Sequence, residues 1–336
     1  MTTTLDVLHR SRRTVRSALL DALGRLDRDI RPVAAYHFGF TGLHGGPPSD
    51  EGKAVRPGLA MASAAAAGAP DGAGLPGAVA VELVHSFSLV HDDLMDGDRT
   101  RRHRPTVWSV WGPATAILVG DALLALAQEI LTEAGTPQAA RAGTLLAATT
   151  RQLVRGQMLD LEFERRDDVT PAECLDMCAA KTGALLSTSA AIGAVLSDAP
   201  GPVVTALAEY GAQLGLAYQL VDDLLGIWGD PATTGKPVFS DLRSRKKSLP
   251  VCHAVNSGTP AGNALADWLA DARDTGVDGL RRGAALVAAA GGRDWAAAEA
   301  RRRVAAAEQA LRTAAIPAAP RAELIDIARF VVDREH

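Results

Sequence analysis

The sequence predicts an all-α fold, and three observations support this prediction. Alanine and leucine, which favour helices, are abundant, whereas aromatic residues make up only 4% of the 336 residues. Apolar residues recur at spacings of three and four in most segments, as expected for helices with one buried face. The alternation of apolar and polar residues that marks a strand is nearly absent.

Clusters of glycine, proline and aspartate divide the chain into about ten helix-sized segments. The expected breaks, in order, lie near residues 42–52, 68–77, 97–105, 135–137, 166–171, 198–202, 229–236, 257–262 and 316–320. None of them has the length of a flexible linker. A single all-α domain is therefore predicted for residues 1–336.

Composition excludes several classes of protein. The formal net charge of −4 argues against a nucleic-acid-binding protein, which needs a basic surface. Three cysteines, Cys174, Cys178 and Cys252, are too few for a disulfide framework and are expected to be buried. The first residues lack the apolar core of a secretory leader, and no uninterrupted apolar stretch approaches the ~20 residues of a membrane span. A cytoplasmic protein without an integral membrane segment is expected.

The first candidate site is a group of three aspartates, Asp92, Asp93 and Asp96, which follows the apolar residues 78–90. On a helix Asp92 and Asp96 lie one turn apart and face the same way, so they repel each other unless a cation lies between them. Because Mg²⁺ takes carboxylates together with substrate phosphates, the group predicts a Mg²⁺ site. The alternative is an acidic, solvated helix end.

A second group, Gln219, Asp222 and Asp223, lies within another apolar segment. Gln219 and Asp223 are one helical turn apart, and an acid pair in an apolar helix is costly without a counter-ion. Two such helices can face each other and hold a diphosphate through bridging Mg²⁺. A di-iron bundle would need two E-x-x-H motifs, and that pair is absent.

The few lysines are candidate phosphate ligands. Only five of the 35 basic residues are lysine, and the other 30 are arginine: the lysines are Lys53, Lys181, Lys236, Lys246 and Lys247. Most stand beside Gly, Thr, Ser or Pro, at expected helix ends or loops, where a compact ammonium can bind a phosphate oxygen. Arg101 and Arg102 closely follow Asp96, and arginine binds phosphate oxygens bidentately. The alternative, favoured for Lys247, is a solvated surface lysine.

These residues belong to a set of motifs that resembles the trans-isoprenyl diphosphate synthases, also called polyprenyl synthetases. The resemblance extends from about Gly52 to Pro250 and is greatest to geranylgeranyl diphosphate synthases. The motifs are G-K-A-V-R-P (52–57), H-S-F-S-L-V-H-D-D-L-M-D (85–96), R-R-H-R-P-T (101–106), G-D-A-L-L (120–124), G-Q-M-L-D-L (156–161), K-T-G-A-L-L (181–186), Y-Q-L-V-D-D-L-L-G (218–226) and G-K-P-V-F-S-D-L-R-S-R-K-K-S-L-P (235–250).

The resemblance implies a helical bundle around a central cavity, usually a homodimer, that condenses isopentenyl diphosphate with an allylic diphosphate. It makes Asp92, Asp93 and Asp96 the first metal motif, and Asp222 with Asp223 the second. The implied ligands of the allylic diphosphate are Arg101, Lys181, Lys236 and Lys246. Those of isopentenyl diphosphate are Lys53, Arg56, His85 and Arg102. Thr182 and Gln219 would line the reacting centre.

The resemblance also predicts the length of the product, and the chain differs from the family pattern at two places. By analogy, bulky Phe87 beside small Ser88, one turn before Asp92, predicts a geranylgeranyl product; the alternative is that Phe87 only packs between helices. Gly226 stands where many members of the family have a third acid, and the first loop, at residues 51–53, reads E-G-K rather than G-G-K.

Two other functions remain open at this stage. A class I terpene cyclase on the same fold would share both metal motifs but would not need Lys53, Arg56, His85 and Arg102. A non-catalytic partner subunit would typically have lost the aspartates, which this chain retains. Consumption of isopentenyl diphosphate in the presence of Mg²⁺ separates these possibilities.

Overall fold

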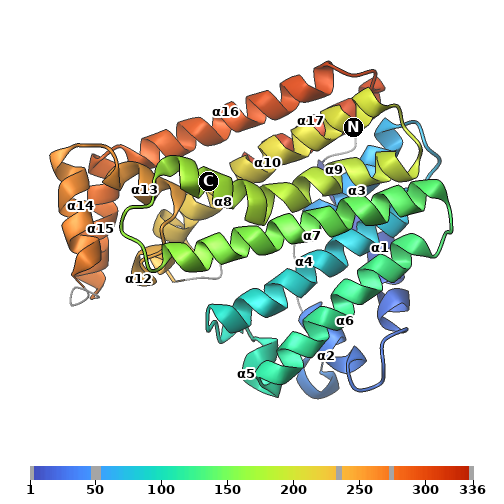
Figure 1. Ribbon diagram of the computed structural model, residues 1–336, viewed down its shortest axis with the longest axis horizontal. Coiled ribbons are helices and arrows are strands. Elements are labelled where there is room, and N and C mark those ends of the chain that lie inside the picture. Colours follow the sequence, from blue (N-terminus) through green and yellow to red (C-terminus); the bar gives the residue numbers. More distant parts are fainter. Residues whose placement is uncertain (1–3, 47–53, 232–236, 272–275, 333–336) are drawn as a thin grey trace. The chain divides into compact units, whose positions relative to one another are not determined.

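The computed structural model describes residues 4–46, 54–231, 237–271 and 276–332 (Figure 1). It confirms the predicted all-α fold. In this part of the chain the only strands are β1 (Thr100–Arg101) and β2 (Arg104–Pro105), which form an antiparallel pair.

The chain forms two compact units, each made of separate stretches. Unit 1 comprises residues 1–150, 188–209 and 310–327, and unit 2 comprises residues 151–187, 210–309 and 328–336. Among the described residues, five helices contribute to both units: α7 (Pro137–Phe163), α9 (Ala184–Leu196), α10 (Gly201–Trp228), α16 (Gly292–Arg312) and α17 (Ala318–Val332). The single domain inferred from the sequence stays a prediction.

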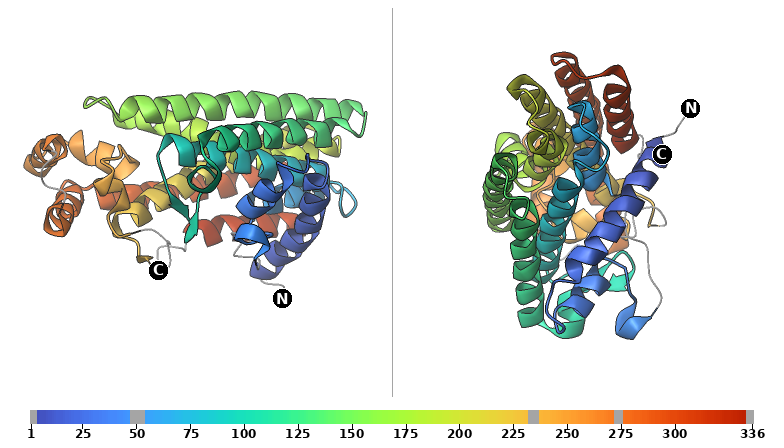
Figure 2. Two further views of the ribbon diagram at one scale, coloured as in Figure 1. Left: turned by 90° about the horizontal axis from the view of Figure 1, so that it is seen from below. Right: turned by 90° about the vertical axis from the view of Figure 1, so that its right-hand side faces the viewer.

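Unit 1 is organised around α4 (Leu75–Met95), whose residues contact α1, α3 and α6. Figure 1 shows α4 and α6 side by side, and the right-hand view of Figure 2 shows α1 beside α4. The remaining elements contained in this unit are α1 (Thr4–Leu23), α2 (Arg31–His37), η1 (Leu43–Gly45), α3 (Val55–Ala66), α5 (Val107–Trp111) and α6 (Pro113–Thr132).

The sequence explains where α4 begins and ends. Pro76 lies in its first turn, where the missing N–H costs nothing and the fixed φ suits a helix. The segment between Gly77 and Val90 is almost entirely buried, so the helix is held by burial on most of its sides. Gly97 adopts a φ of +70° just after the helix and ends it. The first aspartate motif therefore stands at the C-terminal end of a buried helix.

Unit 2 has its apolar core around α8 (Pro171–Cys178) and the second half of α10, with buried side chains that include Phe163, Leu220 and Leu249. Thr170 caps α8 by accepting a hydrogen bond from the Glu173 amide in a reciprocal capping box. The other helices contained in this unit are α12 (Ser240–Arg243), α13 (Leu249–Val255), α14 (Pro260–Ala270) and α15 (Val277–Ala289).

The three cysteines are free and buried, as predicted. Cys174 Sγ and Cys252 Sγ both donate to the Lys247 carbonyl at 3.3 Å. The thiols therefore fix the backbone beside Lys246.

Two helical stretches, Pro113–Thr132 and Pro171–Leu196, meet the length and hydropathy criteria of a membrane span. The second is 61% buried and the first 39% buried in their most apolar windows. Core helices meet the same criteria, so length and hydropathy alone do not indicate a membrane span for either stretch.

Candidate active site

A tight hairpin after α4 positions the arginines of unit 1. Arg102 and His103 form its two-residue turn with φ values of +49° and +60°. Such turns usually carry Asn or Gly, so side chains as large as these strain the backbone. Arg104 anchors the hairpin to α2, because its guanidinium donates to the Tyr36 carbonyl (3.0 Å) and stacks 4.0 Å from the Tyr36 ring centroid.

Arg101 links the hairpin to the first aspartate motif. Its Nε donates to Asp93 Oδ1 at 2.7 Å, and Asp93 is only 1% exposed. The other carboxylate oxygen, Asp93 Oδ2, is buried and has no hydrogen-bond partner among the described residues. Burial raises the pKa of Asp93 to about 6, although the charge of Arg101 opposes this shift. A buried carboxylate oxygen without a partner is what a nearby cation would satisfy.

A pocket of about 50 Å³ opens between α2, α4 and the hairpin, and has room for several water-sized groups. His85 and Asp93 contribute to it from α4, and Arg101 and Arg102 from the hairpin. Arg56 also approaches from α3, since its Nη1 lies 3.2 Å from His85 Nε2. Unit 1 thus brings together four of the predicted diphosphate ligands: Arg56, His85, Arg101 and Arg102.

The electrostatics of this pocket favour an anion. Burial lowers the pKa of His85 well below its usual value, and the charges of Arg56 and Arg102 add to the effect. The pKa of His37, another lining residue, is lowered to about 3 by burial and by the hairpin arginines. Both histidines are therefore neutral at pH 7. The positive charge comes from arginine, which suits an anion with several negative charges.

Asp92 and Asp96 lie one turn apart at the end of α4, Asp92 partly exposed and Asp96 exposed. In the described part of the chain no three His, Cys, Asp or Glu side chains form a closed metal site. Mg²⁺ does not need one, because it retains waters and binds through one or two carboxylates plus phosphate oxygens. With the unpartnered Asp93 Oδ2 beside them, these residues fit Mg²⁺.

In unit 2 a chain of hydrogen bonds joins three predicted residues. Thr182 Oγ1 donates to Gln219 Oε1 at 2.9 Å, and Gln219 Nε2 donates to Asp223 Oδ1 at 2.8 Å. Asp223 Oδ2 accepts from the Leu249 amide at 2.8 Å, so both its oxygens are bound. Burial raises the pKa of Asp223 to about 7, against the lowering charge of Lys246. Asp222, by contrast, is exposed and able to meet a cation.

Lys181 lies in a π-turn, η2 (Ala179–Gly183), inside the helical run from α8 to α9, rather than at the helix end or loop expected from sequence. Single π-turns of this kind are frequent at functional sites. A Cβ at Gly156 of α7 would lie 2.3 Å from the Lys181 nitrogen, and one at Gly215 of α10 would lie 2.6 Å from the Gly183 Cα. The two glycines therefore allow the turn to fit between these helices.

Two acids of unit 2 had no role assigned from the sequence. Asp160 Oδ2 accepts from Lys181 Nζ at 2.6 Å, and the two side chains are only 18% and 20% exposed. Asp241 is 8% exposed and lies near Lys246. The sequence does contain a signal for Asp160, because it is an acid within the helical motif 156–161. An acid in such a helix is costly without a counter-ion, which is the argument that identified Asp222 and Asp223.

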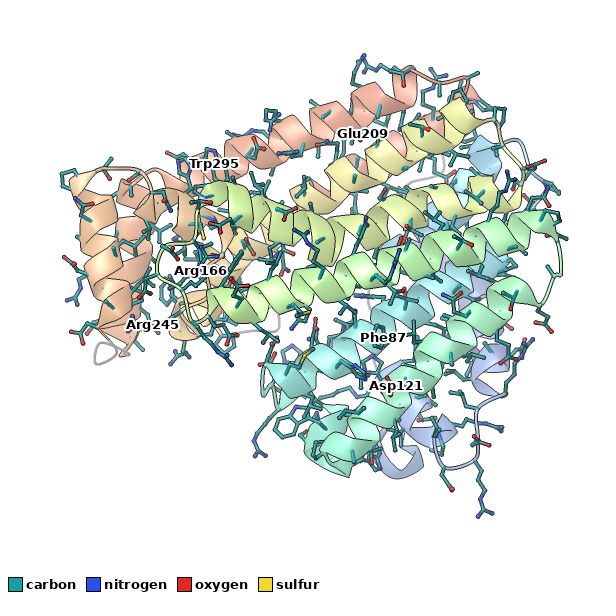
Figure 3. The ribbon with its side chains drawn as sticks, viewed as in Figure 1. Phe87, Asp121, Arg166, Glu209, Arg245 and Trp295 are labelled. Atoms are coloured by element: carbon teal, nitrogen blue, oxygen red, sulfur yellow. The ribbon has the colours of Figure 1, made fainter. Side chains whose placement is uncertain are left out.

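The predicted product-length residues lie on α4. Phe87 is 7% exposed, and its ring makes an edge contact with His91 at a centroid distance of 4.9 Å. His91 in turn lies over Gly120 of α6, where a Cβ would be 2.2 Å from its Nε2. Figure 3 marks Phe87 and Asp121 where these helices run alongside each other. Ser88 is buried, and its hydroxyl donates to the His85 carbonyl. Lys53 and Lys236 lie outside the described residues.

Comparison with known proteins is consistent with this chemistry. The model of the polyprenyl synthetase family matches residues 48–314. The chain is 50% identical to a (2E,6E)-farnesyl diphosphate synthase of Mycobacterium tuberculosis, over 99% of this chain and 94% of the relative. It is 43% identical to a geranylgeranyl diphosphate synthase of the same species, over 98% and 93%.

Solved structures agree. A polyprenyl synthetase from Streptomyces coelicolor is 51% identical and superposes with a TM-score of 0.93, over 97% of this chain and 98% of the other. A Caulobacter crescentus polyprenyl synthase complexed with calcium and isoprenyl diphosphate is 30% identical, with a TM-score of 0.87 over 100% and 99%. The chain belongs to the polyprenyl synthetase family of trans-prenyltransferases.

Proposed function

We propose that this protein condenses isopentenyl diphosphate with an allylic diphosphate, in the presence of Mg²⁺, to a short-chain all-trans prenyl diphosphate. One observation carries the proposal. Both aspartate motifs are retained, each beside arginine or lysine, in a chain half identical to a named farnesyl diphosphate synthase. The Caulobacter relative, which was solved with calcium and isoprenyl diphosphate, supports a divalent cation.

The two units supply two sets of ligands. In unit 1, Asp92 and Asp96 would hold Mg²⁺, Arg101 would bind the allylic diphosphate, and Arg56, His85 and Arg102 would bind isopentenyl diphosphate. In unit 2, Asp222 would hold Mg²⁺ while Lys181 and Lys246 bind the allylic diphosphate. Lys53 and Lys236 are assigned to these ligand sets from sequence alone.

The residues of the site suit ionisation followed by attack of a double bond. Bound Mg²⁺ would neutralise the allylic diphosphate and stabilise it as a leaving group. Lys181, Lys246 and Arg101 would bind the charge that develops on its oxygens. Thr182 and Gln219 are held by hydrogen bonds in one orientation. At the reacting centre they would present fixed dipoles to the allylic carbons. His85 is neutral and serves as a hydrogen-bonding ligand of isopentenyl diphosphate rather than as an acid.

The alternatives are less well supported. A terpene cyclase would not need the cluster of Arg56, His85 and Arg102, which the structure holds together around one pocket. A non-catalytic subunit would not need two intact aspartate pairs. The named relatives are synthases.

Product length is the finer question, because the two relatives are named for different products. Phe87 would form the floor of the chain-growth cavity, with small Ser88 leaving room above it. On this pattern we expect geranylgeranyl diphosphate. Farnesyl diphosphate is the second candidate, favoured by the relative at 50% identity.

The test is a product assay with purified protein, Mg²⁺, isopentenyl diphosphate and, separately, dimethylallyl, geranyl and farnesyl diphosphates. Linear products that disappear on chelation of Mg²⁺ support the synthase, and their chain length distinguishes the two candidates. Phe87→Ala should lengthen the main product by at least one five-carbon unit. If wild-type protein converts an allylic diphosphate to a cyclic hydrocarbon without isopentenyl diphosphate, the proposal is wrong.

A further inference from the structure

Gly226, at the position of the missing third acid, lies directly against another carboxylate. A Cβ at this position would be 2.4 Å from Asp241 Oδ2 and 2.5 Å from Asp241 Cγ. These distances are far below van der Waals contact. The Asp241 carboxylate therefore occupies the space that any side chain at position 226 would take.

Asp241 is held in this position by its own short helix, α12. Ser240 Oγ donates to the Gly226 carbonyl at 3.1 Å and lies 3.2 Å from Asp241 Oδ1, which ties α12 to α10. The Asp241 carbonyl accepts from the Lys246 amide at 2.8 Å. Phe239 enters the helix with a φ of +63°, a strained conformation that these contacts stabilise. Asp241 thus connects the second aspartate helix to the backbone of Lys246.

Four acidic side chains of unit 2 act on the charge of Lys246. Burial would lower its pKa, yet four acids raise it well above its usual value. Asp241 has the largest charge effect among them, ahead of Asp223, Asp160 and Asp222. The Asp241 carboxylate is therefore a main counter-charge of Lys246, the lysine assigned to bind the allylic diphosphate.

We propose that Asp241 stands in for the absent third acid of the second motif and positions Lys246 for the allylic diphosphate, and that Gly226 is required because it makes room for this carboxylate. The inference rests on the proposed function. It explains how a motif with one acid fewer keeps its charge, since the missing carboxylate is supplied from fifteen residues further along the chain.

The experiment exchanges the two positions. We compare wild type, Asp241→Ala, Asp241→Asn, Gly226→Asp and the double variant Gly226→Asp/Asp241→Ala, with exposed Asp278→Asn of α15 as the matched control. Asp241→Ala should lower kcat/KM for the allylic diphosphate about 10- to 100-fold, the scale expected when a charged ligand is misplaced. It should also raise the Mg²⁺ concentration for half-maximal rate, and leave the KM for isopentenyl diphosphate nearly unchanged.

The double variant decides the matter. Gly226→Asp alone should be impaired because two carboxylates compete for one space, whereas the double variant should recover at least about tenfold over Asp241→Ala. Asp241→Asn keeps the shape and removes the charge, so it tests the proposal even if Asp241→Ala does not fold. If both Asp241 variants match wild type, or the folded double variant is no better than Asp241→Ala, Asp241 has no such role. An inactive wild type would instead overturn the proposed function.

Discussion

Within each aspartate pair, the first carboxylate is accessible and the second is buried. Asp92 and Asp222 are partly or fully exposed, whereas Asp93 and Asp223 are each 1% exposed and bonded to protein groups. A buried carboxylate is stable only when it is paired, as Asp93 is by Arg101 and Asp223 by Gln219. The first acid of each pair is therefore suited to meeting a cation. The second is bonded to the local structure, through both oxygens in Asp223 and through one in Asp93, whose Oδ2 is left for a cation.

Gln219 is the central residue of the hydrogen-bond chain in unit 2. Gln219→Met, which has a similar length, should lower kcat by about tenfold because Asp223 Oδ1 loses its donor and Thr182 its acceptor. Steady-state kinetics with both substrates measure the effect. Gln213→Met is the matched control: Gln213 lies on the same helix and contacts Arg303 instead. If kcat falls equally in both variants, these two glutamines of α10 contribute only to stability, and the hydrogen bonds of Gln219 have no catalytic role.

Local spacing predicted part of the site. The predicted one-turn separation of Gln219 and Asp223 is confirmed, and the structure shows a hydrogen bond of 2.8 Å between their side chains. Asp160 and Asp241 were not assigned, because Lys181 lies 21 residues from the first and the Gly226 backbone 15 from the second. Such pairs depend on how helices pack, which periodicity within one helix does not report.

At the scale of elements, the K-T-G turn is produced by helix packing. Glycines on α7 and α10 leave space on both sides of η2, so the helical run from Pro171 to Leu196 continues through Lys181. The sequence placed Lys181 at a helix end because Thr and Gly follow it. The all-α fold was predictable from composition and periodicity. The π-turn and the two-residue strands were not, because each spans too few residues to create a period.

Gly156→Ala tests this packing. Its methyl group would meet the Lys181 backbone at 2.3 Å, so η2 must shift. We expect a lower Tm and a KM for the allylic diphosphate raised about tenfold or more. Gly143→Ala, on the same helix with its nearest atom 3.6 Å away, should leave KM unchanged and Tm equal or higher. Thermal unfolding and steady-state kinetics of the two variants check the prediction. A normal KM in Gly156→Ala would mean that η2 accepts the added methyl group without displacing Lys181.

At the scale of the whole molecule, the homodimer stays a prediction, and α6 offers a way to test it. Leu118 and Ile117 of α6 are 62% and 46% exposed, and adjacent exposed apolar side chains often mark an interface. Leu118→Arg should convert the dimer to a monomer in light scattering at micromolar concentration. Val277→Arg, at a residue of similar exposure on α15, should leave the mass unchanged. A monomeric wild type would contradict the expectation.

Acid stability should depend on the neutral histidines of unit 1. The pKa of His37 is about 3 in the folded protein, mainly because of burial and then of the charges of Arg101, Arg102 and Arg104. An unfolded histidine has a pKa of about 6.5, so between about pH 6.5 and 3 the unfolded chain binds a proton that the folded protein does not. The free energy of unfolding therefore falls as the pH falls through this range, and this contribution is flat above it.

His37→Gln removes this titrating group. The free energy of unfolding of the variant should therefore fall less steeply with decreasing pH, by at most about 1.4 kcal/mol per pH unit. The measurement is urea unfolding of wild type and variant at several pH values between 4.5 and 7.5. The two curves should converge in slope above pH 7, where histidine is neutral in both states. Parallel curves at all pH values would show that His37 takes up a proton in the folded protein. The pocket, which also contains the carboxylates of Glu82 and Asp93, would then accommodate one more positive charge beside its arginines.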